Sequence, residues 1–284
     1  MRKTPRPVAA TEPDLGLDPE LTTRILRGFI RSEVHRAGMA GVVIGLSGGL
    51  DSSVAAFLAV RALGPESVRG VVLPYRSSHP DSSAHAELVL GKLGIVGERL
   101  EITPVVEAFS ALSRPGSRLR LGNAMARIRM ILLYDRSAEI GALVLGTSNK
   151  TELLLGYGTL HGDLASAINP LGDLYKTQVR ALAEHLGVPR AIREKAPSAD
   201  LWPRQSDEAE LGFTYETVDR LLALLVDARV SRRSAIAAGF APRLVDDVIR
   251  RIVRSQFKRR LPLIAKLSTR SIGWDFRYPR DWKS

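Results

Sequence analysis

The 284-residue sequence contains no cysteine, and this absence removes three kinds of chemistry. A chain without thiols has no disulfide, no thiolate zinc site and no cysteine nucleophile. The sequence also lacks an apolar run of the ~18 residues that a membrane-spanning helix needs. Its first residues carry Pro5, Pro7 and Pro13 among charges and have no apolar stretch typical of a signal peptide. We therefore expect a cytoplasmic protein without a membrane partner.

Aromatic residues are scarce, which narrows the choice of binding partner. Phe, Trp and Tyr make up 6% of the sequence, and few of them lie between basic residues, where they could stack on bases. The formal net charge of +11 fits either nucleic acid or small polyanions. Because the basic residues are scattered apart from clusters such as 250–254 and 258–260, we rank nucleic acid second. The five histidines show no metal-ligand spacing on a helix.

Hydrophobic periodicity predicts strands that alternate with helices over the first half of the chain. Helices are expected over 18–37, 53–60, 82–93 and 123–139, strands over 41–46, 68–73, 99–102 and 142–145, and further helices over 176–186, 215–226, 231–238 and 242–255. This alternation favours an α/β fold with a doubly wound parallel sheet and additional C-terminal helices, which we expect to pack on the sheet domain. We expect residues 1–17 to form a flexible arm and residues 18–284 a single domain.

A glycine turn after the first strand is the most informative local feature. Gly48 and Gly49 let the backbone turn sharply into a helix, whose N–H groups can gather around an anion together with serine hydroxyls. The turn lacks the lysine and the spacing of the common P-loop. Asp51 would repel a bare phosphate, but a Mg²⁺ ion between the two would reconcile the charges. The simpler alternative is that Asp51 only caps a helix.

A second polar loop, residues 146–152, follows the strand at 142–145. Because parallel strands end at the same edge of a sheet, its side chains should lie near Asp51. Asp51 and Glu152 could then share a magnesium ion with the phosphates of a nucleotide, and Thr147 could contact that nucleotide. A capped helix start without a site is an equally open alternative.

Three further segments are candidates for the same site. Residues 155–163 carry three glycines in a stretch too irregular for a core, as binding loops often do. Residues 169–177 turn into a helix whose Lys176 could reach a phosphate, although this lysine considered alone is expected to be exposed to solvent. Residues 196–208 are polar, contain two prolines and could be a mobile lid or an ordinary connection.

Seven motifs together resemble the NAD synthetases of the ATP pyrophosphatase superfamily. They are SGGLDS (47–52), NAMARIRM (123–130), GTSNKTE (146–152), GYGTLHGD (156–163), NPL (169–171), APSADL (196–201) and KRRLP (258–262). They follow the order of the family from about residue 20 to residue 262. The resemblance implies an adenine nucleotide alpha hydrolase-like fold and a homodimeric ligase. Such an enzyme makes NAD from ATP, ammonia and nicotinic acid adenine dinucleotide (deamido-NAD).

The resemblance also implies roles for individual residues. ATP would be bound by Gly45, Leu46, Ser47, Gly48, Gly49, Leu50, Asp51, Ser52, Ser53, Thr147, Lys176 and Ser198, and Mg²⁺ by Asp51 and Glu152. Deamido-NAD would be bound by Arg127, Leu160, Ala167, Phe257 and Lys258, although Leu160, Ala167 and Phe257 stand where many relatives have other residues. Lys176 and Asp163 would be catalytic, Lys176 by stabilising charge on pyrophosphate and Asp163 by orienting or deprotonating ammonia.

In the implied reaction, the nicotinate carboxylate attacks ATP to form an acyl adenylate, and ammonia then displaces AMP. This route needs no covalent enzyme nucleophile, which is consistent with a chain without cysteine. Glutamine-dependent relatives carry an additional amidase domain with a cysteine, so we expect free ammonia or a separate glutaminase as the nitrogen source. The rival hypotheses are a tRNA-modifying ATP pyrophosphatase and a nucleotide-binding module without catalysis.

Overall fold

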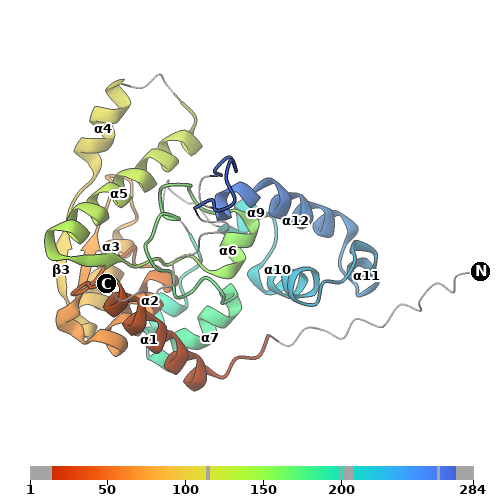
Figure 1. The fold of residues 1–284 in the computed structure, drawn as a ribbon, viewed down its shortest axis with the longest axis horizontal. Coiled ribbons are helices and arrows are strands. Elements are labelled where there is room, and N and C mark those ends of the chain that lie inside the picture. Colours follow the sequence, from red (N-terminus) through yellow and green to blue (C-terminus); the bar gives the residue numbers. More distant parts are fainter. Residues whose placement is uncertain are drawn as a thin grey trace, which may run out of the picture.

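The structure is a computed structural model that describes residues 15–272 except 113–115, 199, 201, 203–206 and 261–262. Its centre is a sheet of four parallel strands in the order β3-β2-β1-β4 (Figure 1). The strands are β1 (Gly41–Gly45), β2 (Val68–Val72), β3 (Val96–Arg99) and β4 (Ala142–Val144). In the register, Val43 of β1 lies opposite Arg69 of β2 and Val144 of β4.

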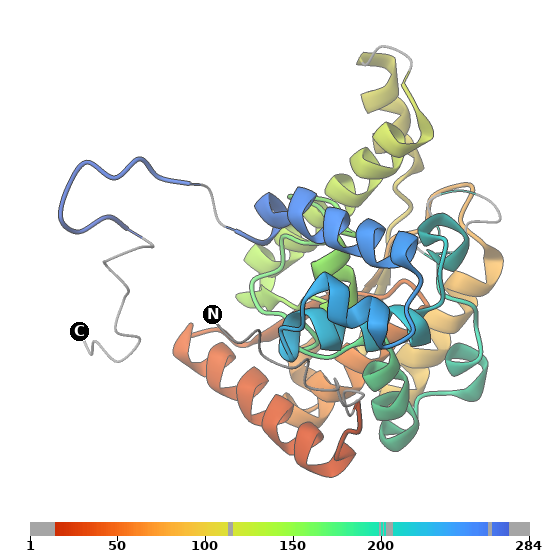
Figure 2. The same ribbon diagram turned by 90° about the vertical axis from the view of Figure 1, so that its right-hand side faces the viewer.

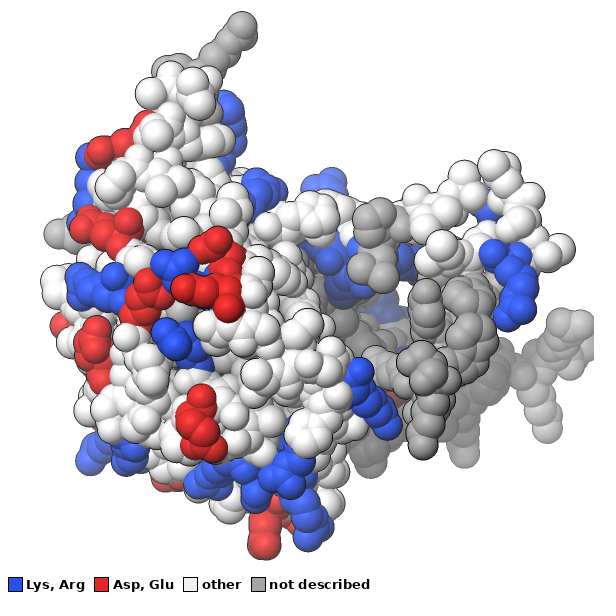
Figure 3. Space-filling view, turned by 60° about the vertical axis from the view of Figure 1, so that its left-hand side comes forward, with Lys and Arg blue, Asp and Glu red and all other residues white. Residues whose placement is uncertain are grey.

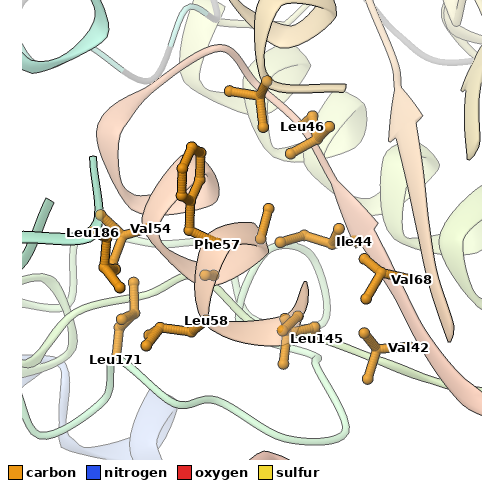
Figure 4. Packing of buried hydrophobic residues seen from close by; sticks show 14 of the residues in the cluster. Val42, Ile44, Leu46, Val54, Phe57, Leu58, Val68, Leu145, Leu171 and Leu186 are labelled. Carbon is orange, nitrogen blue, oxygen red and sulfur yellow. The ribbon is translucent and has the colours of Figure 1, made fainter. Parts of the chain in front are cut away.

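Helices cover both faces of this sheet. One face packs against α1 (Pro19–Arg36), α2 (Leu50–Leu63), α3 (Pro80–Leu93) and α7 (Lys176–Leu186), and the other against α4 (Thr103–Leu112) and α5 (Arg118–Ile140). The alternation of side chains along β1 explains this arrangement. Val42 and Ile44 pack in the cluster that contains α2, whereas Val43 packs with residues of α5 (Figure 4).

The remaining elements lie beyond the sheet. They are η1 (Pro65–Ser67), α6 (Lys150–Leu155), α8 (Arg190–Arg193), α9 (Asp207–Leu211), α10 (Tyr215–Leu222), η2 (Ala223–Asp227), α11 (Arg232–Ala237), α12 (Pro242–Arg254) and η3 (Gln256–Arg259). Helices α10 to α12 share a hydrophobic cluster with Leu155 of α6 and with Tyr175, which precedes α7 (Figure 2). The C-terminal helices therefore contact the sheet layer through α6 and α7.

The predicted doubly wound α/β fold is confirmed, with one misplaced strand and with α4, α8 and α9 not predicted. The strand expected at 99–102 is wrong, because β3 occupies Val96–Arg99 at the edge of the sheet. Val96 is 55% exposed there, so β3 lacks the apolar pattern of a buried strand, while the apolar Ile102 lies in the core beside α4. Among the described residues, no helix has the length and apolar character needed to cross a bilayer. Residues 1–14 of the expected arm lie outside the described residues.

Candidate active site

A cavity of about 480 Å³ lies where β1, β2 and β4 end. Its wall combines Ser47 from the turn after β1, Leu73 from the end of β2 and Thr147 from the loop after β4. These residues are far apart in the sequence, and the parallel sheet brings them to one edge. The edge that was expected to bind a ligand is therefore the edge that carries the cavity.

The glycine turn has a backbone that only glycine fits. Gly48 has φ +70°, and a Cβ atom there would lie 2.0 Å from the carbonyl oxygen of Ser82. The Ser47 and Ser52 hydroxyls are 3.1 Å apart, and Ser53 donates from its hydroxyl to the Gly49 carbonyl at 2.7 Å. The Gly49 cap of α2 has no side chain that bonds to the first turn of the helix. The positive end of α2 thus faces the cavity beside two serine hydroxyls, which suits an anion.

Asp51 and Glu152 meet at the cavity with Lys176 between them. The Lys176 ammonium donates a hydrogen bond to Asp51 Oδ2, and its Nζ lies 3.5 Å from Glu152 Oε1. Asn149 donates from its side-chain amide to Asp51 Oδ1 at 3.0 Å. Glu152 is part of a capping box with Asn149, which fixes the start of α6. The sequence left two alternatives for Glu152, a site residue or part of a helix cap. In the structure Glu152 is part of the cap of α6 and also faces the cavity.

Lys176 is buried, so the alternative of an ordinary solvent-exposed lysine in a first helical turn is wrong. Only 3% of its surface is accessible, because the first turn of α7 lies under the C-terminal helices. The ring of Tyr215 from α10 lies 5.3 Å from its Nζ, a distance typical of a cation–π contact. A lysine in a first helical turn is normally solvated, and here a neighbouring layer of helices covers it.

Burial and charge shift the pKa values of this group. Desolvation, followed by the nearby Asp51 carboxylate, raises the pKa of Glu152 to about 8. Desolvation opposes the charge on Lys176, but Asp51 and Glu152 outweigh it, so the pKa of this ammonium is raised. Lys176 is therefore charged at neutral pH, while a further cation is needed to keep both carboxylates ionised.

The two carboxylates fit a magnesium ion that arrives with a phosphate ligand. Mg²⁺ prefers oxygen donors and is usually held by one or two carboxylates together with substrate phosphates and water. The described residues contain no group of three or more His, Cys, Asp or Glu side chains placed to hold a metal. Asp51 and Glu152 thus supply part of a coordination shell that phosphate oxygens and water would complete.

The stability of the metal-free chain should depend on pH through Glu152. The folded carboxyl keeps a proton up to about pH 8 that the unfolded chain releases near its ordinary pKa of 4.5. Rising pH therefore favours the unfolded chain across this interval. We expect this effect in the presence of a chelator. As the pH rises from about 5 to about 8, the free energy of unfolding of the wild type should fall relative to that of Glu152→Gln. Urea unfolding of both chains measures this difference, and Glu87→Gln on the exposed face of α3 should show no such trend.

Most residues expected to bind ATP line the cavity. These are Gly45, Leu46, Ser47, Gly49, Leu50, Asp51, Ser52, Thr147, Lys176 and Ser198. Gly48 and Ser53 do not line it: Gly48 packs against Ser82, and the buried Ser53 hydroxyl bonds to the backbone of the turn. These two residues shape the turn and do not face the cavity.

The residues expected to bind deamido-NAD are divided between the cavity and the surface. Lys258 lines the cavity and donates to the carbonyl oxygens of Gly156 and Gly158, each at 2.8 Å. Arg127, Leu160, Ala167 and Phe257 do not line the cavity. Arg127 lies on the surface and donates to the Leu160 carbonyl at 3.1 Å. Within one chain, these four side chains lie outside the enclosed site.

Asp163 lies in the cavity wall, where solvent in the cavity reaches it. Its Oδ1 accepts a hydrogen bond from the Thr159 N–H at 2.8 Å. The surrounding protein desolvates the carboxylate and raises its pKa, although the hydrogen bonds from Thr159 act in the opposite direction. Asp163 is therefore a proton acceptor within the same cavity as the Asp51 group.

Sequence reasoning missed Arg129, which lines the cavity. Its Nε donates to the Leu73 carbonyl at 2.9 Å, and desolvation lowers its pKa while Asp200 and Asp163 act in the opposite direction. Arg127 and Arg129 are two residues apart on α5, so their side chains point about 200° apart around the helix. The paired arginines were visible in the sequence, but the side of α5 that faces the cavity was not.

Sequence reasoning also missed an aromatic and acidic group behind Lys176. The Tyr157 hydroxyl lies 2.8 Å from Asp207 Oδ1 and 2.9 Å from Glu210 Oε2 and can donate its one proton to either, and Tyr215 donates to Asp207 Oδ2 at 3.2 Å. Asp207 is 4% exposed and begins α9, whose first residues fall at the end of the segment 196–208 that was expected to be a lid or a connection. No periodic signal marks these residues, because they come from separate loops and helices.

Comparison with known proteins points to one family. A family model described as NAD synthase matches residues 22–262. The NH(3)-dependent NAD(+) synthetase of Pelodictyon phaeoclathratiforme is 56% identical over 270 residues, which cover 95% of this chain and 98% of that protein.

Solved structures give the same grouping. The NH3-dependent NAD synthetase from Campylobacter jejuni has a TM-score of 0.75 at 35% identity and covers 88% of this chain and 100% of that one. The NMN synthetase from Francisella tularensis has a TM-score of 0.78 at 34% identity and covers 88% of this chain and 99% of that one.

Proposed function

We propose that this chain, which belongs to the NAD synthase family, is an ammonia-dependent NAD synthetase. It joins ammonia to the nicotinate carboxylate of deamido-NAD and converts ATP to AMP and pyrophosphate. The observation that carries the proposal is the buried Lys176 between Asp51 and Glu152, at the mouth of a glycine turn that suits phosphate. This arrangement can bind the triphosphate and stabilise the negative charge that develops on it during the reaction.

Different residues of the site bind ATP and stabilise charge in the first step, the transfer of AMP to the nicotinate carboxylate. A carboxylate is a poor electrophile toward ammonia, so transfer of AMP to it supplies a leaving group. The N-terminus of α2 and the Ser47 and Ser52 hydroxyls bind phosphate oxygens, and Thr147 and Ser198 complete the ATP site. Lys176 stabilises the negative charge that develops on pyrophosphate as the α-phosphorus is attacked. Because Lys176 is buried and held by two carboxylates, it needs little reorganisation during the reaction.

Asp51 and Glu152 would hold Mg²⁺ beside the phosphates. When bound, this ion polarises phosphate oxygens and neutralises charge on pyrophosphate. The raised pKa of Glu152 supports the assignment, because a nearby divalent cation would stabilise its ionised form. The two side chains do no other chemistry in the proposed reaction.

The second step uses the part of the cavity wall that Asp163 and Arg129 line. Asp163 orients ammonia or accepts a proton from it as nitrogen attacks the acyl adenylate, and AMP leaves. Arg129, on the same wall, can neutralise a phosphate or carboxylate of the intermediate. No residue forms a covalent bond to substrate in this scheme.

A second copy of the chain would complete the deamido-NAD site. Arg127, Ile131 and Tyr134 follow each other at helical spacing along one side of α5, and Ile131 is 66% exposed. Tyr134 donates to the Ala165 carbonyl at 2.6 Å, so this side of α5 lies next to the loop that carries Ala167. An exposed apolar surface beside the proposed dinucleotide residues supports a homodimer with the substrate near its interface. Leu160, Ala167 and Phe257 would then contact deamido-NAD only in the dimer.

Two further parts of the proposal concern the cell. We propose that the enzyme works in the cytoplasm and takes ammonia from solution or from a separate glutaminase. The absence of cysteine supports the second point, because the amidase domains of glutamine-dependent relatives depend on that residue. On the face shown in Figure 3, acidic side chains are interspersed among the basic ones, which argues against a continuous nucleic-acid surface there.

A direct assay tests the proposed function. Purified chain with ATP, Mg²⁺, ammonium and deamido-NAD should release NAD and AMP in equal amounts. Nicotinic acid mononucleotide should be supplied in a parallel reaction, because one similar structure is named an NMN synthetase. Amidation of the mononucleotide alone would reassign the substrate. Turnover with glutamine in place of ammonium would contradict the proposed nitrogen source.

Asp163→Asn should impair use of ammonia more than use of ATP. We expect kcat/KM for ammonium to fall by about 10-fold or more, because the amide cannot accept the proton. The KM for ATP should stay within about twofold, since Asp163 belongs to the loop at 156–163 and not to the glycine turn or to the Lys176 group. Initial rates against ammonium concentration measure the effect. Full turnover at limiting ammonium would exclude this role for Asp163.

A further inference from the structure

A buried carboxylate outside the cavity connects the two helices that carry the site. Asp219 of α10 is fully buried and does not line the cavity. Its Oδ1 accepts a hydrogen bond from the Thr151 hydroxyl at 2.5 Å. Its Oδ2 accepts from the Thr177 N–H at 2.8 Å and from the Thr177 hydroxyl at 2.9 Å. We call Asp219, Thr151 and Thr177 the Asp219 clamp.

Each threonine of the clamp is adjacent to a residue of the active site. Thr151 precedes Glu152 in α6, and Thr177 follows Lys176 in α7. In addition, the Thr151 hydroxyl oxygen accepts a hydrogen bond from the Lys176 N–H at 3.0 Å. Thr151 thus receives a bond from the backbone of Lys176 and donates one to Asp219. The clamp therefore sets the distance between the start of α6 and the start of α7.

The position of Asp219 follows from the sequence of α10. Tyr215, Asp219 and Leu222 are spaced by four and three residues, so they share one face of this helix. All three are buried, and the Tyr215 ring lies over the Lys176 ammonium. The face of α10 that contacts the sheet layer thus carries both an aromatic ring for the Lys176 side chain and a carboxylate that accepts from Thr151 and from Thr177.

A buried carboxylate costs free energy unless hydrogen bonds satisfy it. Asp219 satisfies both oxygens with groups from two different helices, and no described lysine or arginine forms an ion pair with it at the distances that define the other pairs. An apolar residue would avoid the desolvation cost, but it would leave the Thr177 N–H and the two threonine hydroxyls without this acceptor. The carboxylate thus connects α6 with α7 through hydrogen bonds that an apolar side chain cannot make.

We propose that Asp219 is a positioning residue that holds Lys176 and Glu152 at the separation that ATP and its metal require. The inference deepens the proposed function and rests on it for the identity of the reaction. It predicts that loosening the clamp weakens ATP binding and catalysis without altering the deamido-NAD site. That site depends on α5 and on the loop at 156–163, which the clamp does not contact.

A pair of variants at Thr151, one without the hydroxyl and one that keeps it, tests the inference. Thr151→Val removes the hydroxyl that contacts both Asp219 and the Lys176 N–H, whereas Thr151→Ser retains it. We expect Thr151→Val and Asp219→Asn to raise the Kd for MgATP and lower kcat by about 10- to 100-fold, the range for partners that orient metal-site groups. Thr151→Ser should stay within about threefold of the wild type, and the KM for deamido-NAD should stay within about twofold in all variants.

Asp246→Asn is the matched control. Asp246 is on α12 and pairs with Arg232 of α11 at the surface, so the same substitution there should change neither Kd nor kcat. Isothermal titration with MgATP reports on folded protein, so partial unfolding does not imitate a change in Kd. If Asp219→Asn fails to fold, the comparison of Thr151→Val with Thr151→Ser still tests whether the clamp positions Lys176.

Two outcomes separate the clamp from the proposed reaction. Wild-type affinity for MgATP and wild-type kcat in Thr151→Val would overturn the positioning role. Loss of MgATP affinity in Thr151→Val, together with no NAD formation by the wild type, would support the clamp and refute the proposed function.

Discussion

Replacement of Lys176 by methionine should lower kcat by about 10³-fold, the upper range for loss of one preorganised group that stabilises a transition state. Methionine has a similar length but no charge, so it removes the stabilisation of developing pyrophosphate. It also leaves the Asp51 and Glu152 carboxylates facing each other without the cation between them. The measurement is the initial rate of AMP and NAD formation at saturating substrates.

The control for this variant is Lys92→Met, on the exposed face of α3. It makes the same change in charge and should leave kcat unaltered. Circular dichroism should show that Lys176→Met is folded, because a protonated Glu152, favoured by its raised pKa, does not repel the Asp51 carboxylate. A folded Lys176→Met chain with a kcat within about threefold of the wild type would refute the role of Lys176 in catalysis.

Asp51→Asn should raise the Mg²⁺ concentration for half-maximal rate by about 10²-fold. The amide keeps the size of the side chain but removes a charge that would hold the ion beside the phosphates. It also replaces one of the two oxygens that accept from Lys176 and Asn149 with an NH2 group, which cannot accept. The same titration of Glu152→Gln should show a similar change, because the structure places both carboxylates on the same lysine.

The form of the Mg²⁺ titration separates a metal ligand from a structural residue. A ligand variant should recover part of its rate at high Mg²⁺, whereas a misfolded chain should not. Glu87→Gln, on the surface of α3, supplies the matched control and should follow the wild-type curve. An unchanged Mg²⁺ dependence in both Asp51→Asn and Glu152→Gln would remove the proposed metal site.

Local patterns were sufficient for much of the fold. Apolar runs placed β1, β2 and β4 within a residue or two, and the proline and cap at residues 18 and 19 marked the start of α1. The edge strand β3 was misplaced because Val96 and its neighbours lack a buried pattern. Residues 103–112 were not recognised as a helix. Only Val106 of α4 is buried, so this helix does not bury the apolar stripe that marks the other helices.

The sequence by itself determined the glycine turn, the absence of thiol chemistry and the presence of two acidic residues after neighbouring strands. These follow from residue identity and from the rule that parallel strands end at one edge. Only the tertiary structure decided that Lys176 is buried between the two acids, that Arg129 and not Arg127 faces the cavity, and that Asp219 connects α6 with α7. The physical reason is that burial and pairing depend on residues far apart in the chain, such as Asp51 and Lys176, which are separated by 125 positions. Their contact arises when helices pack, and no local pattern encodes which helix will cover which side chain.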